Sequence, residues 1–190
     1  MPIVWTQDPK ANELLEADPL ALLIGMVLDQ QVKMEKAFGG PYELKRRLGH
    51  LDVRKIASMD PGKLDAVFRE RPALHRFPGS MAKRVQSMCQ AVVMEYGADA
   101  GSVWRDARDG ADLAARIKKL PGFGEMKVKI LVAVLAKKFG VKPAGWEKQA
   151  ASWHTVADVD SVETMAKARE VKREMKAGVT VKKARNQAKS

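Results

Sequence analysis

The chain has 190 residues, a length that suits one compact domain, and a formal net charge of +11. Its single cysteine, Cys89, excludes a disulfide framework and any iron–sulfur or zinc site built from cysteines alone. The three histidines show no metal-ligand spacing, and no apolar run approaches the length of a membrane span. Because no basic-then-apolar leader opens the sequence, we expect a cytoplasmic, nucleoid-associated protein.

The positive charge is concentrated in two blocks. Residues 116–142 contain eight lysines and arginines and one acid, Glu125. Residues 167–190 contain nine basic residues and two glutamates, so the remaining chain is slightly acidic. An acidic body with two basic patches is typical of a nucleic-acid-binding protein. For the second block a solvated tail is the favoured interpretation, whereas the first block favours binding.

The first strong helix signal lies at residues 18–28. Asp18 is a good N-cap, and Pro19 suits the first helical position. Residues 20–28 are apolar on every side, which predicts a buried central helix. The apolar run ends abruptly at Asp29, Gln30 and Gln31.

Short helices should follow, separated by tight turns. Phe-Gly-Gly-Pro at residues 38–41 predicts a break, with helices over 42–48, 52–59 and 63–68. Ser80 is a plausible N-cap for a helix over 81–96, whose apolar face includes Cys89 as a buried thiol. No segment reads as a strand, so the sequence predicts an all-α fold.

The chain is organised around a glycine turn between two helices, over residues 111–119 and 126–139. The turn reads Leu120, Pro121, Gly122, Phe123, Gly124, with lysines on both sides. Glycine permits a positive φ and lets another backbone come close. The unpaired N–H groups that open the second helix would bind a phosphate. A glycine cap between two packed helices is the simpler alternative.

Residues 120–124 resemble the hairpin of the helix-hairpin-helix (HhH-GPD) DNA glycosylase superfamily at every position. The resemblance implies a compact two-lobed helical fold over residues 1–177, with a DNA groove between the lobes and a basic, flexible tail at 178–190. It also implies that Gln30 and Gln31 lie at the mouth of that groove, where a family residue fills the gap left by an extruded base. The residues expected to contact DNA are Leu120, Gly122, Gly124, Met126, Lys127, Gln30, Gln31 and Lys83, with Arg84, His75 and Arg76 as further candidates.

Four carboxylates are candidates for the catalytic residue. The family places an aspartate after the hairpin, in a Val-Asp motif near the start of the next helix. Counting from Phe139, the residue at that place is Glu147, a longer carboxylate that could stabilise a positively charged sugar or align a water. Asp158, Asp160 and Asp29 are alternatives, and Glu147 could also be an exposed helix-start residue.

Lyase-type family members carry a lysine two residues after the second hairpin glycine, where this chain has Met126. Lys127 lies one residue further, about 100° around the helix. The resemblance therefore implies a monofunctional glycosylase, a monomer that needs no cofactor, metal or iron–sulfur cluster and acts on damaged or mispaired duplex DNA. The alternative is a DNA-binding protein with this fold and no catalysis.

Overall fold

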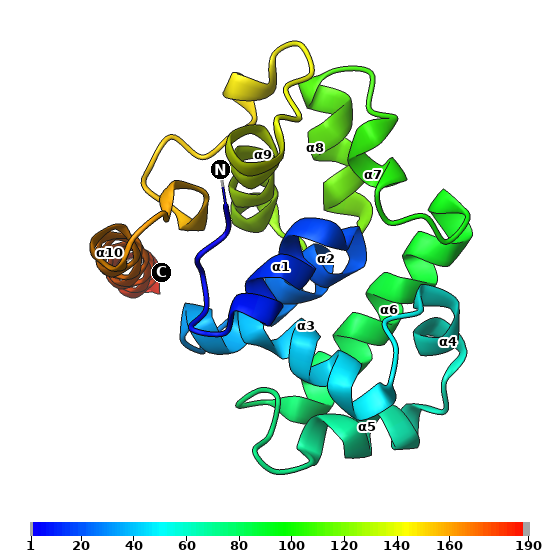
Figure 1. The fold of residues 1–190 in the computed structure, drawn as a ribbon. Helices are drawn as coiled ribbons and strands as arrows, with labels where there is room; N and C mark the ends of the chain where they lie inside the picture. Colours follow the sequence, from blue (N-terminus) through cyan, green and yellow to red (C-terminus); the bar gives the residue numbers. More distant parts are fainter. Residues whose placement is uncertain (1, 188–190) are drawn as a thin grey trace.

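The computed structural model describes residues 2–187, and side chains up to residue 178. All regular structure in this range is helical, so the all-α prediction is confirmed. Figure 1 shows α1 and α2 between the group α3–α6 and the group α7–α9, with α10 at one edge. A division into two lobes stays a prediction. The elements are α1 (Pro9–Ala17), α2 (Pro19–Leu28), α3 (Met34–Leu48), α4 (Val53–Ser58), α5 (Pro61–Arg69), α6 (Pro78–Tyr96), α7 (Ser102–Arg105), α8 (Gly110–Lys119), α9 (Glu125–Phe139), η1 (Trp146–Lys148), η2 (Val156–Asp158) and α10 (Val162–Gln187).

Helix α2 forms the centre of the core, as its composition predicts. The Asp18 carboxylate accepts hydrogen bonds from the backbone N–H of Leu20, at 2.9 Å, and of Ala21. Nine of the ten residues of α2 are buried. A segment that is apolar on every side must be covered on every side, which explains why α2 lies between the other helices.

The predicted break at residues 38–41 is wrong, because α3 runs unbroken through Pro41. The glycines there serve close packing instead of a turn. A Cβ on Gly40 would lie 2.5 Å from Leu28 Cδ1, and one on Gly25 would lie 2.8 Å from Phe38 Cδ1. Burial of α3 against α2 therefore outweighs the hydrogen bond that Pro41 cannot donate.

Two other helix boundaries differ from the prediction. Helix α6 begins at Pro78, two residues before Ser80, because proline fits the first turn of a helix and Phe77 takes the cap position. Helix α10 is helical to Gln187, where a flexible tail was expected from residue 178. The side chains of residues 179–187 and the whole of 188–190 lie outside the described part, so the tail's role stays a prediction.

The hairpin between α8 and α9 has the expected geometry. Gly122 adopts φ +95°, a conformation that L side chains rarely take. The Phe123 N–H donates to the Leu120 carbonyl at 3.2 Å, and Gly124 forms the N-cap of α9. Leu120 and Phe123 are buried in the core, so the turn is anchored while its glycine backbone stays accessible.

Candidate nucleic-acid interface and catalytic cavity

A cavity of about 720 Å³ opens where the end of α2, the start of α9 and one face of α10 meet. A volume of this size is typical of small-molecule sites. Most of its surface is apolar, with a few polar and charged groups. Its lining comprises Met26, Asp29, Gln30, Gln31, Met34, Met126, Lys127, Ile130, Trp153, His154, Thr155, Val156, Ala168, Lys172, Met175 and Lys176.

Asp29 is the one of the four candidate carboxylates that lines this cavity. Its side chain is 9% exposed and forms an ion pair with Lys172 of α10. Glu147 lies in the 3-10 turn η1, is exposed, and does not line the cavity. The residue found by counting along the chain from the hairpin, Glu147, therefore lies outside the cavity.

Asp158 and Asp160 take part in local structure. The Asp158 carboxylate pairs with Lys137 and accepts a hydrogen bond from the Thr155 backbone N–H at 2.9 Å. Burial alone would raise the pKa of Asp158, but these two hydrogen bonds outweigh burial and lower it below the ordinary value. Asp160 accepts a hydrogen bond from the Thr164 hydroxyl at 2.9 Å, just before α10 begins.

Lys127 joins the hairpin helix to the central helix. Its Nζ donates a hydrogen bond of 2.9 Å to the Val27 carbonyl oxygen, in the last turn of α2. That carbonyl is one of the four that a helix C-terminus leaves without an intrahelical donor. Burial lowers the pKa of Lys127 to about 8, although the nearby charge of Asp29 opposes the shift. Lys127 thus fixes the start of α9 against the end of α2.

Lys127→Met is expected to flatten the pH dependence of stability above about pH 8. The folded pKa of about 8 lies below the ordinary 10.5, so in this window the unfolded chain binds a proton that the folded chain has released. The free energy of unfolding of the natural protein therefore rises with pH and is about 1–2 kcal/mol higher near pH 9.5 than near pH 7.5. Urea unfolding of both proteins at about pH 7.5 and 9.5 measures the difference. If the free energy of unfolding depended on pH equally in both proteins, the lowered pKa of Lys127 would be contradicted.

The two glutamines after α2, Gln30 and Gln31, lie in different environments. The side-chain oxygen of Gln30 accepts a hydrogen bond of 2.6 Å from Arg84 Nη1, which ties it to α6. Gln31 is exposed and adopts φ +57°, which is uncommon for a residue with a side chain. The Gln30 side chain is therefore held against α6, whereas Gln31 is exposed on the turn.

His75 holds the backbone of this turn. Its Nδ1 accepts a hydrogen bond from the Phe77 N–H at 2.9 Å, so its Nε2–H donates to the Gln30 carbonyl at 2.8 Å. Burial lowers the pKa of His75, which favours this neutral form. His75 is 1% exposed, so its ring lies inside the protein and holds the turn from below the surface.

A second hollow, of about 540 Å³, lies over the hairpin itself and shares Gln30, Met126 and Lys127 with the cavity. Its floor includes Leu120, Gly122 and Gly124, so the structure brings the expected hairpin residues to one surface. Lys83 is exposed but does not line this hollow, whereas its neighbour Arg84 does. The sequence could not show which of these two residues faces the hairpin, because both lie in the first turns of one helix.

The lining residues His154 and Lys172 were not singled out from the sequence as site residues. The His154 ring nitrogen Nε2 lies 3.0 Å from the Thr164 carbonyl, which fixes the ring beside the cavity. Among the residues that the structure describes, no group of three or more His, Cys, Asp and Glu side chains is placed to hold a metal ion. No helix within residues 2–187 is long and apolar enough to cross a membrane.

The comparison with protein families agrees with the hairpin. The sequence model of the HhH-GPD superfamily of base excision DNA repair proteins matches residues 24–186, from the middle of α2 to the end of α10. Neither a curated protein nor a solved structure matches the chain. The family match spans most of the chain and includes both the hairpin and the cavity. The chain therefore belongs to the HhH-GPD superfamily of base excision DNA repair proteins.

Proposed function

We propose that the protein is a monofunctional DNA N-glycosylase that hydrolyses the bond between the sugar and a damaged or mispaired base. The observation that carries this proposal is a carboxylate, Asp29, inside a largely apolar cavity that adjoins the hairpin surface. A base in duplex DNA is inaccessible to such a cavity, so the nucleotide must first leave the stack. We further propose that the protein acts as a monomer on nucleoid DNA in the cytoplasm.

The hairpin and the end of α2 would bind and open the duplex. The N–H groups at the start of α9 point out of the Gly124 cap and bind a backbone phosphate. Gln31 fills the gap that the extruded nucleotide leaves, because its uncharged amide both donates and accepts hydrogen bonds. Trp153 and the methionine side chains of the cavity provide apolar surface for the flipped base.

Asp29 would perform the chemistry. As the bond from C1′ to the base nitrogen breaks, the electron pair leaves with the base and positive charge develops on the sugar. The Asp29 carboxylate stabilises that charge and accepts a proton from the water whose oxygen bonds to C1′. Its present partner, Lys172, must move aside or remain paired through one carboxylate oxygen.

The monofunctional assignment is supported by the residues that follow Gly124. Met126, at the family's lysine position, has no nucleophilic atom for a Schiff base. Lys127 directs its Nζ to the Val27 carbonyl. Borohydride reduction during turnover should therefore trap no covalent protein–DNA adduct. A trapped adduct that is lost in Lys127→Met would instead show lyase chemistry through this amine.

The proposal is tested with duplexes that each carry one lesion: an alkylated purine, a deaminated pyrimidine, an oxidised guanine or a mismatch. We expect abasic sites on at least one duplex, with strand breaks appearing only after alkali. Breaks without alkali would contradict the monofunctional assignment.

A second candidate, a DNA-binding protein with this fold and no catalysis, is favoured by the ion pair between Asp29 and Lys172. That pair partly neutralises the carboxylate in the free protein. This candidate predicts tight binding to a lesion duplex without release of any base, and the same panel separates the two.

A further inference from the structure

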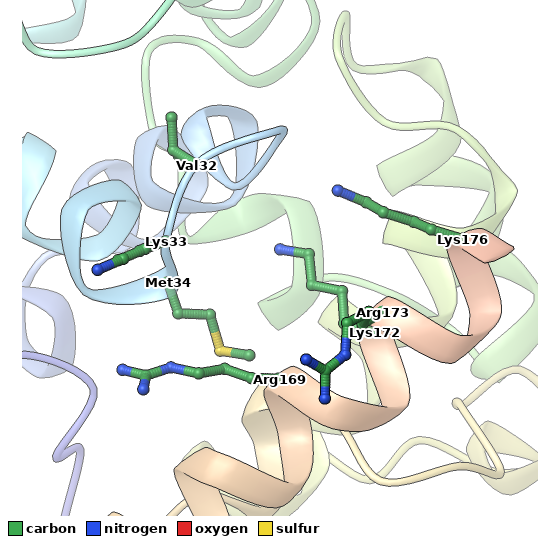
Figure 2. A pocket seen from close by; sticks show the side chains of 7 residues that line it. All are labelled: Val32, Lys33, Met34, Arg169, Lys172, Arg173 and Lys176. Carbon is green, nitrogen blue, oxygen red and sulfur yellow. The ribbon is translucent and has the colours of Figure 1, made fainter.

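A basic groove lies where α10 passes the segment that leads into α3. It has a volume of about 270 Å³ and is lined by Val32, Lys33, Met34, Arg169, Lys172, Arg173 and Lys176. Figure 2 shows the cationic side chains of α10 on the side of the helix that faces Met34. Five of the seven lining residues are cationic and none is acidic.

The charges of α10 are sorted by helix face. Residues 172, 173 and 176 follow Arg169 at spacings of three, four and seven, which places all four within an arc of about 100° on one side of the helix. The acids of the same segment, Glu163, Glu170 and Glu174, lie about 100–140° away from Arg169. Lys167 lies on this acidic side, so the basic stripe is defined by the absence of acids from the arc that holds residues 169, 172, 173 and 176.

Acidic partners balance only part of this charge. Arg169 pairs with Glu35, and Lys172 pairs with Asp29. No ion pair or hydrogen bond of Lys33 or Arg173 is found within the described residues, and Arg173 is exposed. The groove therefore keeps a net positive charge that an anionic ligand would neutralise.

The basic groove continues into the cavity, because both are lined by Met34, Lys172 and Lys176. A strand whose nucleotide occupied the cavity would extend its neighbouring phosphates over this groove. The hairpin hollow adjoins the same cavity through Met126 and Lys127. Cationic surfaces thus border the cavity on two sides.

We propose that the basic groove binds the backbone phosphates of the DNA strand that enters the cavity, next to the extruded nucleotide. This proposal rests on the proposed function, since it assumes that the cavity receives a nucleotide. Arginine and lysine side chains are the usual partners of backbone phosphates and carry no sequence preference in that role. The groove and the hairpin hollow share no lining residue, so the groove would hold the strand away from the hairpin.

A nucleic-acid strand fits the groove better than an anionic membrane surface. An interfacial helix needs an exposed apolar face to enter the lipid boundary. The apolar residues of α10 next to the basic stripe, Met165 and Ala168, are buried against the protein. The α10 side chains that line the groove are all charged and suit phosphates held at the surface of the molecule.

The test compares Lys33→Ala/Arg173→Ala with a control of equal charge, Lys63→Ala/Lys167→Ala. Lys63 is exposed on α5, and Lys167 lies on α10 about 160° from Arg169. Binding to a lesion duplex is measured between about 50 and 300 mM salt. Each lost phosphate contact should reduce the slope of log affinity against log salt by about 0.9, so the first variant should lose about 1–2 units and the control none.

A duplex with neutral methylphosphonate linkages flanking the lesion locates the contact. On that duplex the affinity penalty of Lys33→Ala/Arg173→Ala should shrink, because the phosphates that it contacts are already neutral. An unchanged penalty, or equal salt slopes for both variants, would overturn the proposal. Loss of binding to phosphatidylserine vesicles with unchanged DNA binding would also overturn it and indicate a membrane surface.

The same data separate this proposal from the proposed function. If no base is released from any duplex but the groove variant still loses salt slope and the control does not, the groove binds DNA and the glycosylase assignment fails alone. If base release is intact and the two variants bind equally, the groove assignment fails alone.

Discussion

Asp29→Asn is expected to lower the single-turnover rate of base release by about 10²- to 10³-fold, with little change in duplex affinity. The amide keeps the shape of the side chain but loses the negative charge that opposes the developing charge of the sugar. Because Asp29 is the candidate carboxylate within the cavity, its removal should affect the chemical step and not the encounter with DNA. The rate is measured with enzyme in excess over a lesion duplex.

Glu147→Gln is the matched control for this experiment. Glu147 is exposed in η1 and lies outside the cavity, so its charge should not affect the reacting bond. We expect a rate within about twofold of the natural protein. A large loss in Glu147→Gln with a normal rate in Asp29→Asn would contradict the assignment of Asp29.

Gly124→Ala is expected to lower duplex affinity by at least about tenfold while lowering the free energy of unfolding by only about 0.5–1 kcal/mol, because alanine is a poorer N-cap than glycine. Gly124 has φ −79°, and a Cβ there would meet no atom within 4 Å. The protein itself therefore tolerates the methyl group. A phosphate seated on the N–H groups of α9 would not, because the methyl stands where the DNA backbone must approach. Equilibrium binding and urea unfolding measure the two effects.

Gly122→Ala should act differently, since it strains the protein as well. Its φ of +95° is unfavourable for alanine, and the new Cβ would lie 3.2 Å from atoms of Val27 and Arg84. A loss of about 1–3 kcal/mol in stability is expected. Gly49→Ala serves as its control, because Gly49 has φ +78° with open space and lies at the end of α3. Equal duplex affinity for all three glycine variants and the natural protein would contradict a DNA contact at the hairpin.

The hairpin could be predicted from the sequence because its signals are local. Two glycines, a proline and a helix start within a few residues determine the turn, and the structure confirms the positive φ of Gly122. The buried helix α2 was predictable for the same reason, since Asp18, Pro19 and an apolar run define it. Both elements are specified by neighbouring residues.

The cavity could not be predicted in this way, because its parts are distant in the chain. Asp29 and Lys172 are separated by 143 positions, and Lys127 reaches the Val27 carbonyl across 100. Counting along the chain from the hairpin led to Glu147, which lies in η1 and does not line the cavity. The unbroken α3 was missed because Gly40 is needed for contact with Leu28 of another helix.

The end of α2 brings several proposed roles together. Asp29, Gln30 and Gln31 are consecutive, and they follow a helix whose last nine residues are buried. A rigid helix end can hold a catalytic carboxylate and a gap-filling amide at a fixed distance from each other. Arg84, His75 and Lys127 hold this turn from α6, the preceding loop and α9.

The central claim is that a base leaves the duplex, enters the cavity and is cut from its sugar. The most direct measurement is the amount of free base released from each lesion duplex in a single turnover, quantified by mass spectrometry. We expect one molecule of base per duplex for at least one lesion, and loss of that release in Asp29→Asn. Saturated binding of every duplex with all bases retained would contradict it.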